Sequence, residues 1–200
     1  MWLAGILLLA GCAGTRASYM VYGERYHPGY DFGELQYYNG DKEMAVEVIN
    51  TPFEDKKATA RDIALSMRGK NRGTRIAFTA EPGPLTPKQT KIIIAFDMRP
   101  SDDGYGYCRD YLPDETGQTG TSTAQTETET DRLHMVMVYC KRNSFVSSVR
   151  ARMPRPATVN DPAFQNMLAE VTRRLLPRPH PLYDDDQREE TRRLLDILGY

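Results

Sequence analysis

The sequence predicts a single α+β domain, in which two helices pack on one face of a mainly antiparallel sheet of about five strands. The first observation behind this prediction is the order of the apolar segments, which read β-α-β-β-β-β-α between residues 41 and 176. The second is the length of the chain, 200 residues, which is enough to bury one core. The third is that no stretch after residue 12 approaches the roughly 18 apolar residues typical of a membrane-spanning helix.

Strand-like patterns occur in several segments. We expect strands over residues 44–49, 74–79, 91–96, 133–140 and 145–153. Residues 91 to 96 are nearly all apolar, which predicts a central strand with both faces buried, and the strand before it is expected to be its hairpin-like neighbour. The last two segments are joined by a short turn, which predicts an antiparallel hairpin in which Phe145, Ser147 and Val149 share one face.

Helical periodicity occurs twice within the domain. Over residues 57 to 68, apolar side chains recur at i, i+3, i+4 and i+7, and Gly69 follows as an expected C-cap. A second helix is expected to begin with Asp161 as its N-cap and Pro162 in its first turn. Its core-facing stripe is expected to comprise Phe164, Met167, Leu168, Val171 and Leu175.

Three other segments lack such periodicity. Residues 12 to 40, rich in tyrosine and glycine, are expected to form a flexible tether; the alternative is that the tyrosines pack on the domain or begin its first strand. Residues 114 to 131 contain no large apolar side chain and are expected to form a disordered loop within the domain of residues 41 to 176. Residues 177 to 200 are expected to form a proline-rich linker and a short tail helix.

The segment of residues 1 to 11 is uncharged and almost wholly apolar. A helix of that length spans about 16 Å, whereas the hydrocarbon core of a bilayer is about 30 Å thick. A short apolar run that ends in small residues is instead typical of a secretory signal peptide. The run ends in Leu9-Ala10-Gly11-Cys12, which resembles the lipobox of bacterial lipoproteins.

This resemblance implies that residues 1 to 11 are removed and that Cys12 becomes a lipid-modified N-terminus carrying palmitate-type acyl chains. It places the protein in the cell membrane or outer membrane, with its domain facing the periplasm. Ala13 stands where lipoproteins retained in the inner membrane of enteric bacteria have Asp, which favours the outer membrane. The pattern departs from the family in that no Lys or Arg precedes Arg16. The alternative is an ordinary cysteine in an ordinary signal peptide.

The lipoprotein resemblance leaves Cys108 and Cys140 as a pair, because the chain has three cysteines. Export implies an oxidising compartment, in which such a pair is expected to form a disulfide. The bond would close a loop of about 33 residues and stabilise the fold by roughly 3–4 kcal/mol. The alternative is two reduced cysteines, one of them buried in a strand.

Four short motifs resemble a family of uncharacterised proteobacterial exported proteins. They are Thr51-Pro52-Phe53, Phe78-Thr79-Ala80-Glu81-Pro82-Gly83, Phe145-Val146-Ser147-Ser148-Val149-Arg150 and Asp161-Pro162-Ala163-Phe164. The resemblance covers residues 44 to 176 and implies one domain over that span. It implies nothing about chemistry, because no activity is attached to the family.

No constellation of catalytic or metal-binding residues emerges from the sequence. His27, His134 and His180 lack the spacing of a helical metal site, so neither a metal nor another cofactor is expected. Loop carboxylates occur at Asp102-Asp103 and at residues 184 to 186, where solvated turns are their expected role. The formal net charge of -1 argues against a nucleic acid as partner.

One cluster of basic residues follows the predicted hairpin and the last predicted helix. It comprises Arg150, Arg152, Arg155, Arg173, Arg174 and Arg178. Anionic lipid or an acidic envelope protein is the partner expected for such a patch; the alternative is a solvated face balanced by the acidic tail. We therefore expect a lipid-anchored envelope protein that acts by binding or assembly, without catalysis. The alternatives are an envelope hydrolase that uses the loop carboxylates and a carrier of small ligands.

Overall fold

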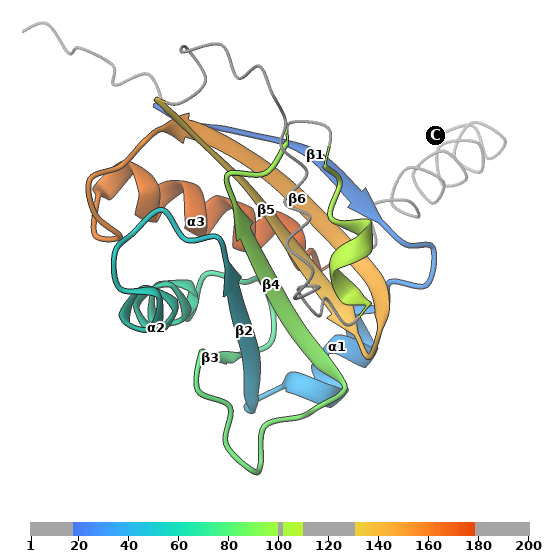
Figure 1. Cartoon of the computed structure of the whole chain (residues 1–200). Coiled ribbons are helices and arrows are strands. Elements are labelled where there is room, and N and C mark those ends of the chain that lie inside the picture. The colour runs from blue at the N-terminus through green and yellow to red at the C-terminus, as the bar shows by residue number, and fades with distance from the viewer. Residues whose placement is uncertain (1–17, 100–101, 110–130, 179–200) are drawn as a thin grey trace, which may run out of the picture.

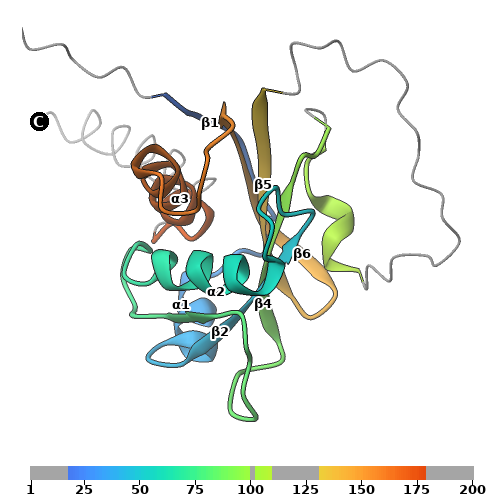
Figure 2. The same cartoon turned by 60° about the vertical axis from the view of Figure 1, so that its left-hand side comes forward.

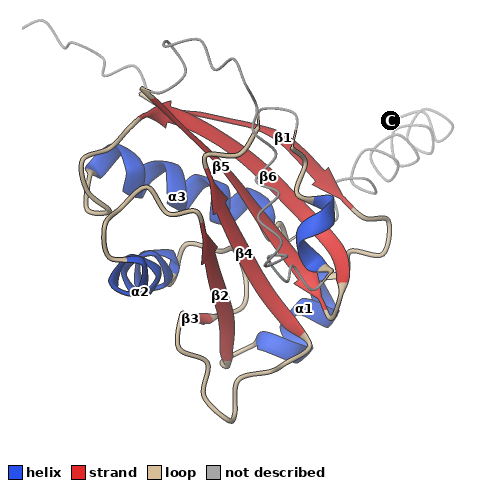
Figure 3. Ribbon diagram, viewed as in Figure 1, coloured by secondary structure: helices blue, strands red, loops and turns tan. Residues whose placement is uncertain are grey.

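A mixed sheet with the strand order β1-β6-β5-β4-β2-β3 forms the centre of the molecule (Figure 1). The structure, a computed structural model, describes residues 18–99, 102–109 and 131–178. The strands are β1 Met20–Tyr26, β2 Glu43–Ile49, β3 Ala77–Thr79, β4 Thr90–Phe96, β5 Arg132–Lys141 and β6 Ser144–Pro154. The helices are α1 Phe32–Asn39, α2 Lys56–Met67, α3 Pro162–Leu175 and the 3-10 helix η1 Tyr105–Cys108 (Figure 3). The predicted α+β class is confirmed.

The pairing of the strands confirms a mainly antiparallel sheet and corrects one expected neighbour. Three neighbouring pairs are antiparallel, namely β1–β6, β6–β5 and β5–β4. In contrast, β2 runs parallel to both of its neighbours, β3 and β4. The expected hairpin-like pairing of β3 with β4 is wrong, because β2 lies between them. The loop of residues 80 to 89 is long enough to return the chain past β2, and sequence periodicity says nothing about which strands become neighbours.

The expected tether over residues 12 to 40 is wrong for the part that the structure describes. β1 adds an edge strand to the sheet, with Val21 opposite Ala151, and α1 follows it with Asp31 as its N-cap. Tyr30 and Leu35 are buried in the main core. The alternative that these tyrosines begin the first strand is therefore confirmed. The alternation was hidden because the register shifts between Tyr22 and Arg25, around a glycine with positive φ.

The three helices α1, α2 and α3 cover one face of the sheet (Figure 2). Side chains alternate along a strand, so Ile92, Ile94 and Phe96 of β4 face these helices and are fully buried. The predicted stripe of α3 is confirmed, since all five of its residues are buried in this core. Phe164 at the start of the stripe contacts the rings of Phe53 and Phe96, which ties α3 to the ends of β2 and β4.

The opposite face of the sheet is covered at its centre by residues 102–109, which we call the cover segment (Figure 2). Tyr107 and Cys108 of this segment form a second buried cluster with Ile93, Val136 and Val138. This explains why nearly every residue of β4 is apolar: the strand has a buried neighbour on each face. The prediction of a central strand buried on both faces is confirmed.

An extra residue in β6 changes which side chains share a face. Tyr139 of β5 lies opposite Ser147, but Cys140 lies opposite Phe145, so Val146 has no partner of its own in the register. This bulge turns Phe145 to the face of the cover segment, where it packs with that cluster. The expectation that Phe145 shares a face with Ser147 and Val149 is therefore wrong.

Several predicted segments lie outside the described residues. These are the signal segment with Cys12, the loop of residues 114 to 131 apart from Asp131, and the tail helix. Among the helices that the structure describes, none is long and apolar enough to cross a membrane.

Candidate functional site

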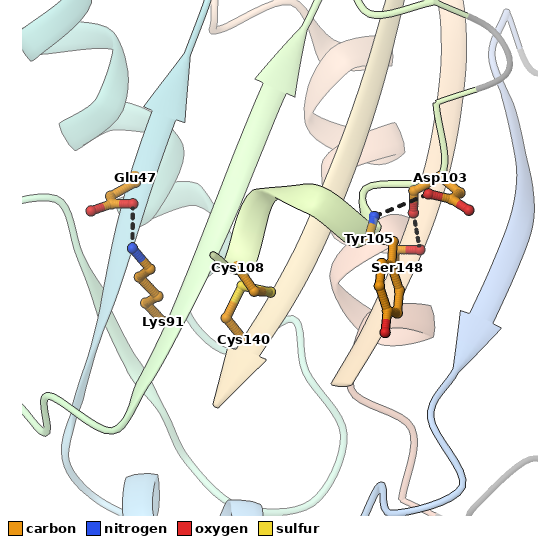
Figure 4. The surroundings of a disulfide bond; sticks show 7 residues. All are labelled: Glu47, Lys91, Asp103, Tyr105, Cys108, Cys140 and Ser148. Carbon is orange, nitrogen blue, oxygen red and sulfur yellow. Dashed lines mark hydrogen bonds and ion pairs between the residues drawn. A yellow bond between two sulfur atoms is a disulfide. The ribbon is translucent and has the colours of Figure 1, made fainter. Parts of the chain in front are cut away.

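A disulfide joins Cys108 of η1 to Cys140 of β5, with an S–S distance of 2.02 Å and a Cα–Cα distance of 5.4 Å (Figure 4). Both cysteines are almost fully buried. The predicted disulfide is therefore present in the structure, and it is consistent with an exported protein. The bond fixes the cover segment on the sheet.

Carboxylates hold the turn that begins the cover segment. The Asp102 carboxylate accepts hydrogen bonds from the Gly104 N–H at 2.9 Å and from the Tyr107 hydroxyl at 2.9 Å. Gly104 has a φ of 79°, and a Cβ there would lie 2.5 Å from a methyl group of Val138. A glycine is therefore required where the chain turns onto the sheet.

Asp103 binds the same segment to β6 and β1. Its carbonyl accepts a hydrogen bond from the buried Ser148 hydroxyl at 2.7 Å (Figure 4). Its carboxylate accepts from the Tyr105 N–H at 3.0 Å and pairs with Arg25 at 2.6 Å. The carboxylates of Asp102 and Asp103 thus already have structural partners.

The six arginines predicted to form one patch do not lie on one surface. Arg150 and Arg152 project from the face of β6 opposite the helices and lie over the Tyr22 ring, 5.2 and 5.8 Å from its centroid. Arg155 pairs with Asp97 at 2.8 Å. Arg173 and Arg174 belong to the last turn of α3, on the other side of the sheet, and Arg178 is exposed at the end of the described chain. The expected single patch is therefore wrong.

A cleft of about 430 Å³ lies on the helix side, and we call it the α3 cleft. It is lined by Glu24, Tyr26, Arg72, Glu170, Arg173, Arg174 and Pro177. These residues come from β1, from the turn after α2 and from the C-terminal end of α3. The cleft therefore joins three arginines and two carboxylates that lie far apart in the sequence.

The α3 cleft contains more cationic than anionic side chains. Arg174 pairs with Glu24 at 2.6 Å and also with Glu170, one helical turn away. The hydrogen bond that Arg174 donates to the Glu24 carboxylate contributes most to raising the pKa of Arg174. Both carboxylates are therefore engaged by one guanidinium. Arg72 and Arg173 have no acidic partner in the part of the chain that the structure describes.

Two tyrosines hold the chain at one side of this cleft. The Tyr26 hydroxyl donates to the carbonyl of Arg174 at 2.5 Å, and the Tyr30 hydroxyl donates to the carbonyl of Pro177 at 2.7 Å. Their rings contact edge to face at 6.1 Å. Burial raises the pKa of both hydroxyls above the ordinary value for tyrosine. Both side chains therefore remain neutral hydrogen-bond donors at neutral pH, and they fix the end of α3.

A second cleft, of about 260 Å³, lies where β1 begins and where β6 ends; we call it the β1 cleft. It is lined by Ser18, Tyr19, Met20, Arg132, Arg152, Met153 and Pro154. Met20 pairs with Arg152 across the sheet, and Arg132 pairs with Pro154. Antiparallel pairing thus places the first described residues of the chain beside two arginines.

Three charged residues of these clefts, Glu24, Arg72 and Arg132, were not predicted from the sequence. Arg72 lies in a basic run, residues 68 to 75, that reads as a turn, and nothing in the sequence connects it, Glu24 or Arg132 to a common site. Their proximity results from long-range contacts: β1 with β6, and the turn after α2 with the end of α3. The arginine pair at the end of α3 and Arg152 were among the residues predicted from the sequence.

The two histidines that the structure describes, His27 and His134, lie in different parts of the fold. His27 lies in the exposed turn after β1, where its Nδ1 accepts a hydrogen bond from the Gly29 N–H at 3.0 Å. His134 lies on β5 opposite Arg152, and His180 lies outside the described residues. Within residues 18–99, 102–109 and 131–178, no group of three or more His, Cys, Asp or Glu side chains is arranged to hold a metal ion.

These features define a disulfide-fixed sheet with one arginine-containing cleft on the helix side and a second at the beginning of β1. In comparisons with known proteins, the chain matches no family model, no curated protein sequence and no solved structure.

Proposed function

We propose that this is a lipid-anchored protein of the bacterial cell envelope that acts by binding, and that its α3 cleft binds an anionic group of another envelope component. Two features support the anchor. The segment Leu9-Ala10-Gly11-Cys12 has the residue types of a lipobox, and the Cys108–Cys140 disulfide fits an oxidising compartment outside the cytoplasm. The periplasm, at the surface of the cell membrane or outer membrane, is the location that follows.

The observation that carries the binding role is the presence of Arg72 and Arg173 in a cleft whose two carboxylates are both engaged by Arg174. A guanidinium is planar and presents several N–H donors, which suits it to a carboxylate or a phosphate. Arg174 is held in place by its acidic partners and by the tyrosines behind it. An anionic ligand therefore meets two available guanidinium groups beside a rigid one.

The same chemistry favours binding over catalysis. The raised pKa of Tyr26 keeps its hydroxyl protonated, and that hydroxyl already donates to a backbone carbonyl. Glu24 and Glu170 are both paired with Arg174, so both carboxylates already have a structural partner. In the described part of the chain, neither alternative function has an observation in its favour. Asp102 and Asp103 hold a turn, and both clefts described above are lined largely by polar and charged residues rather than by an apolar cavity.

The anchor is tested by intact mass spectrometry of the protein extracted from membranes, beside a Cys12→Ala variant. The expected mass lacks residues 1 to 11 and includes acyl chains, and the variant loses both changes. Reduction should add two hydrogen atoms, one for each sulfur of the disulfide. An unmodified protein in the soluble fraction would contradict the anchor.

The binding role is tested by thermal unfolding of the full chain in a neutral detergent, with inorganic phosphate as the probe and chloride at equal ionic strength as reference. A saturating rise in melting temperature of about 3 to 6 °C at roughly ten times the dissociation constant is expected for one site. The double variant Arg72→Gln with Arg173→Gln should lose the rise. The double variant Arg99→Gln with Arg142→Gln, at two exposed arginines outside the cleft, is the control of equal charge. Equal behaviour of the two variants would contradict the α3 cleft as the site.

A further inference from the structure

The β1 cleft lies close to the proposed point of anchoring. Cys12 and Ser18 are separated by five residues, and six peptide steps reach at most about 21 Å when fully extended. Ser18 itself lines the β1 cleft. If Cys12 carries the acyl chains, this cleft is therefore held within about 21 Å of the bilayer surface.

The composition of the β1 cleft fits a bilayer surface that carries anionic headgroups. Arg132 and Arg152 have no acidic partner in the described part of the chain. Met20 is 49% exposed although it is large and apolar. Cations attract the phosphates of anionic lipids, at about 1 kcal/mol for each Lys or Arg near the surface, while an apolar side chain can enter the interface beside them.

The backbone of both arginines of this cleft is held in the sheet. Arg152 lies over the Tyr22 ring and pairs through its backbone with β1 and β5. Arg132 is the first residue of β5, and the backbone carbonyl of Asp131 before it accepts a hydrogen bond from the Arg155 N–H at 2.9 Å. Two arginines whose backbone is held on neighbouring strands meet a charged surface without ordering of the main chain, so less conformational entropy is lost on contact than for arginines on a flexible loop.

We propose that the β1 cleft rests on the anionic surface of the membrane, with Arg132 and Arg152 on lipid phosphates and Met20 in the interface. This inference rests on the proposed lipid anchor and adds an orientation to it. In this orientation, the end of the sheet at which β1 and β5 begin faces the bilayer. The loop before β4, which contains Leu85, lies at the opposite end and points away from the bilayer (Figure 1).

The chain provides a suitable reporter, because its one tryptophan is Trp2 and is removed with the signal segment. Met20→Trp places a fluorophore in the β1 cleft, and Leu85→Trp places one at the far end, where the native side chain is 92% exposed. The acylated full-length protein is reconstituted into liposomes of phosphatidylethanolamine and brominated phosphatidylglycerol. We expect quenching of about twofold or more for Met20→Trp, since interfacial side chains reach about 5–10 Å into the headgroup boundary, and little for Leu85→Trp. Pro154→Trp is a second reporter of the same cleft.

The role of the arginines is tested in the Met20→Trp background. Arg132→Gln is expected to reduce the quenching, because it removes a phosphate contact. Arg142→Gln removes the same charge just beyond the other end of the ten-residue strand β5 and should leave the quenching unchanged. Replacement of phosphatidylglycerol by brominated phosphatidylcholine should act like Arg132→Gln.

The outcomes separate this inference from the anchor on which it rests. If intact mass shows acylation but Met20→Trp is quenched no more than Leu85→Trp, the orientation is overturned and the anchor stands. If quenching is equal with anionic and neutral lipids, the proposed phosphate contacts are overturned. If the protein carries no acyl chains, the anchor and the orientation both fail.

Discussion

The Arg150 guanidinium occupies the space that a side chain at position 23 would need. A Cβ at Gly23 would lie 2.3 Å from Nε of Arg150, and Gly23 has a φ of 64°. Arg150 in turn lies over the Tyr22 ring at 5.2 Å. The register shift in β1 between Tyr22 and Arg25 therefore coincides with the place where Arg150 of β6 packs across the strand.

Gly23→Ala is predicted to lower the free energy of unfolding by about 2 kcal/mol, from backbone strain and from loss of the Arg150–Tyr22 contact. Gly69→Ala is the matched control: Gly69 has a φ of 70°, but no atom lies within 4 Å of its added Cβ. It should cost about 1 kcal/mol, from strain alone. Urea unfolding measures both. If Arg150→Ala does not reduce the cost of Gly23→Ala, the steric explanation is incorrect.

Removal of the disulfide is predicted to lower the free energy of unfolding by about 3 to 4 kcal/mol, on the loop-entropy model for a bond between residues 32 apart. Reductant and the double variant Cys108→Ala with Cys140→Ala should have similar effects, because both free the cover segment. The measurement is the urea midpoint with and without reductant. A reductant effect that persists in the double variant would show that the cysteines are not its cause.

Asp161→Ala is predicted to destabilise the protein by about 1 kcal/mol through loss of the N-cap of α3. The Asp161 carboxylate accepts hydrogen bonds from the N–H groups of Ala163 at 2.8 Å and Phe164 at 3.2 Å. Asp161→Asn keeps an acceptor and should remain close to the wild type. If both variants lose the same stability, the charge of Asp161 matters and its capping geometry does not.

Stability is predicted to fall in alkaline solution because burial raises the pKa of the Tyr30 and Tyr139 hydroxyls. An unfolded chain loses these protons near pH 10, whereas the folded chain keeps them, so the folded state binds more protons above that pH. The contribution is complete below about pH 10 and is lost as the pH rises toward the folded-state pKa, at up to about 1.4 kcal/mol per pH unit for each hydroxyl.

Urea unfolding between about pH 9 and 11 measures this slope. Tyr139→Phe should make the slope shallower while it preserves the ring. Tyr37→Phe should not change the slope, since Tyr37 is 75% exposed. A slope that is the same in all three proteins would rule out Tyr139 as a source.

The local pattern of the sequence predicts most of the elements of this fold. The alternation and apolar content of β2, β4, β5 and β6 identify them as strands, and the stripe and the Asp161 cap identify α3. These features depend on neighbours in sequence, which is why they are visible there. β1 is not visible, because Gly23 interrupts its alternation and two of its residues, Tyr22 and Tyr26, are of a type that occurs in several environments.

The pairing of elements and the composition of the clefts are not predictable in this way. Whether β3 lies beside β4 or beyond β2 depends on tertiary packing, and one bulge residue, Val146, reverses the face of Phe145. The same limit applies to the arginines. Arg150 and Arg173 are both close to predicted core residues, but the sheet lies between them, while Arg72 reaches the α3 cleft from a remote turn.

The Cys108–Cys140 bond makes residues 108 to 140 a covalent ring. A single protease cut between those two cysteines breaks the chain but does not separate its halves, since β4 and the cover segment remain joined to β5. The nicked molecule would migrate as one species without reductant and as two fragments with it. Insertions or deletions between Cys108 and the start of β5 would likewise leave both ends of that segment attached to the sheet.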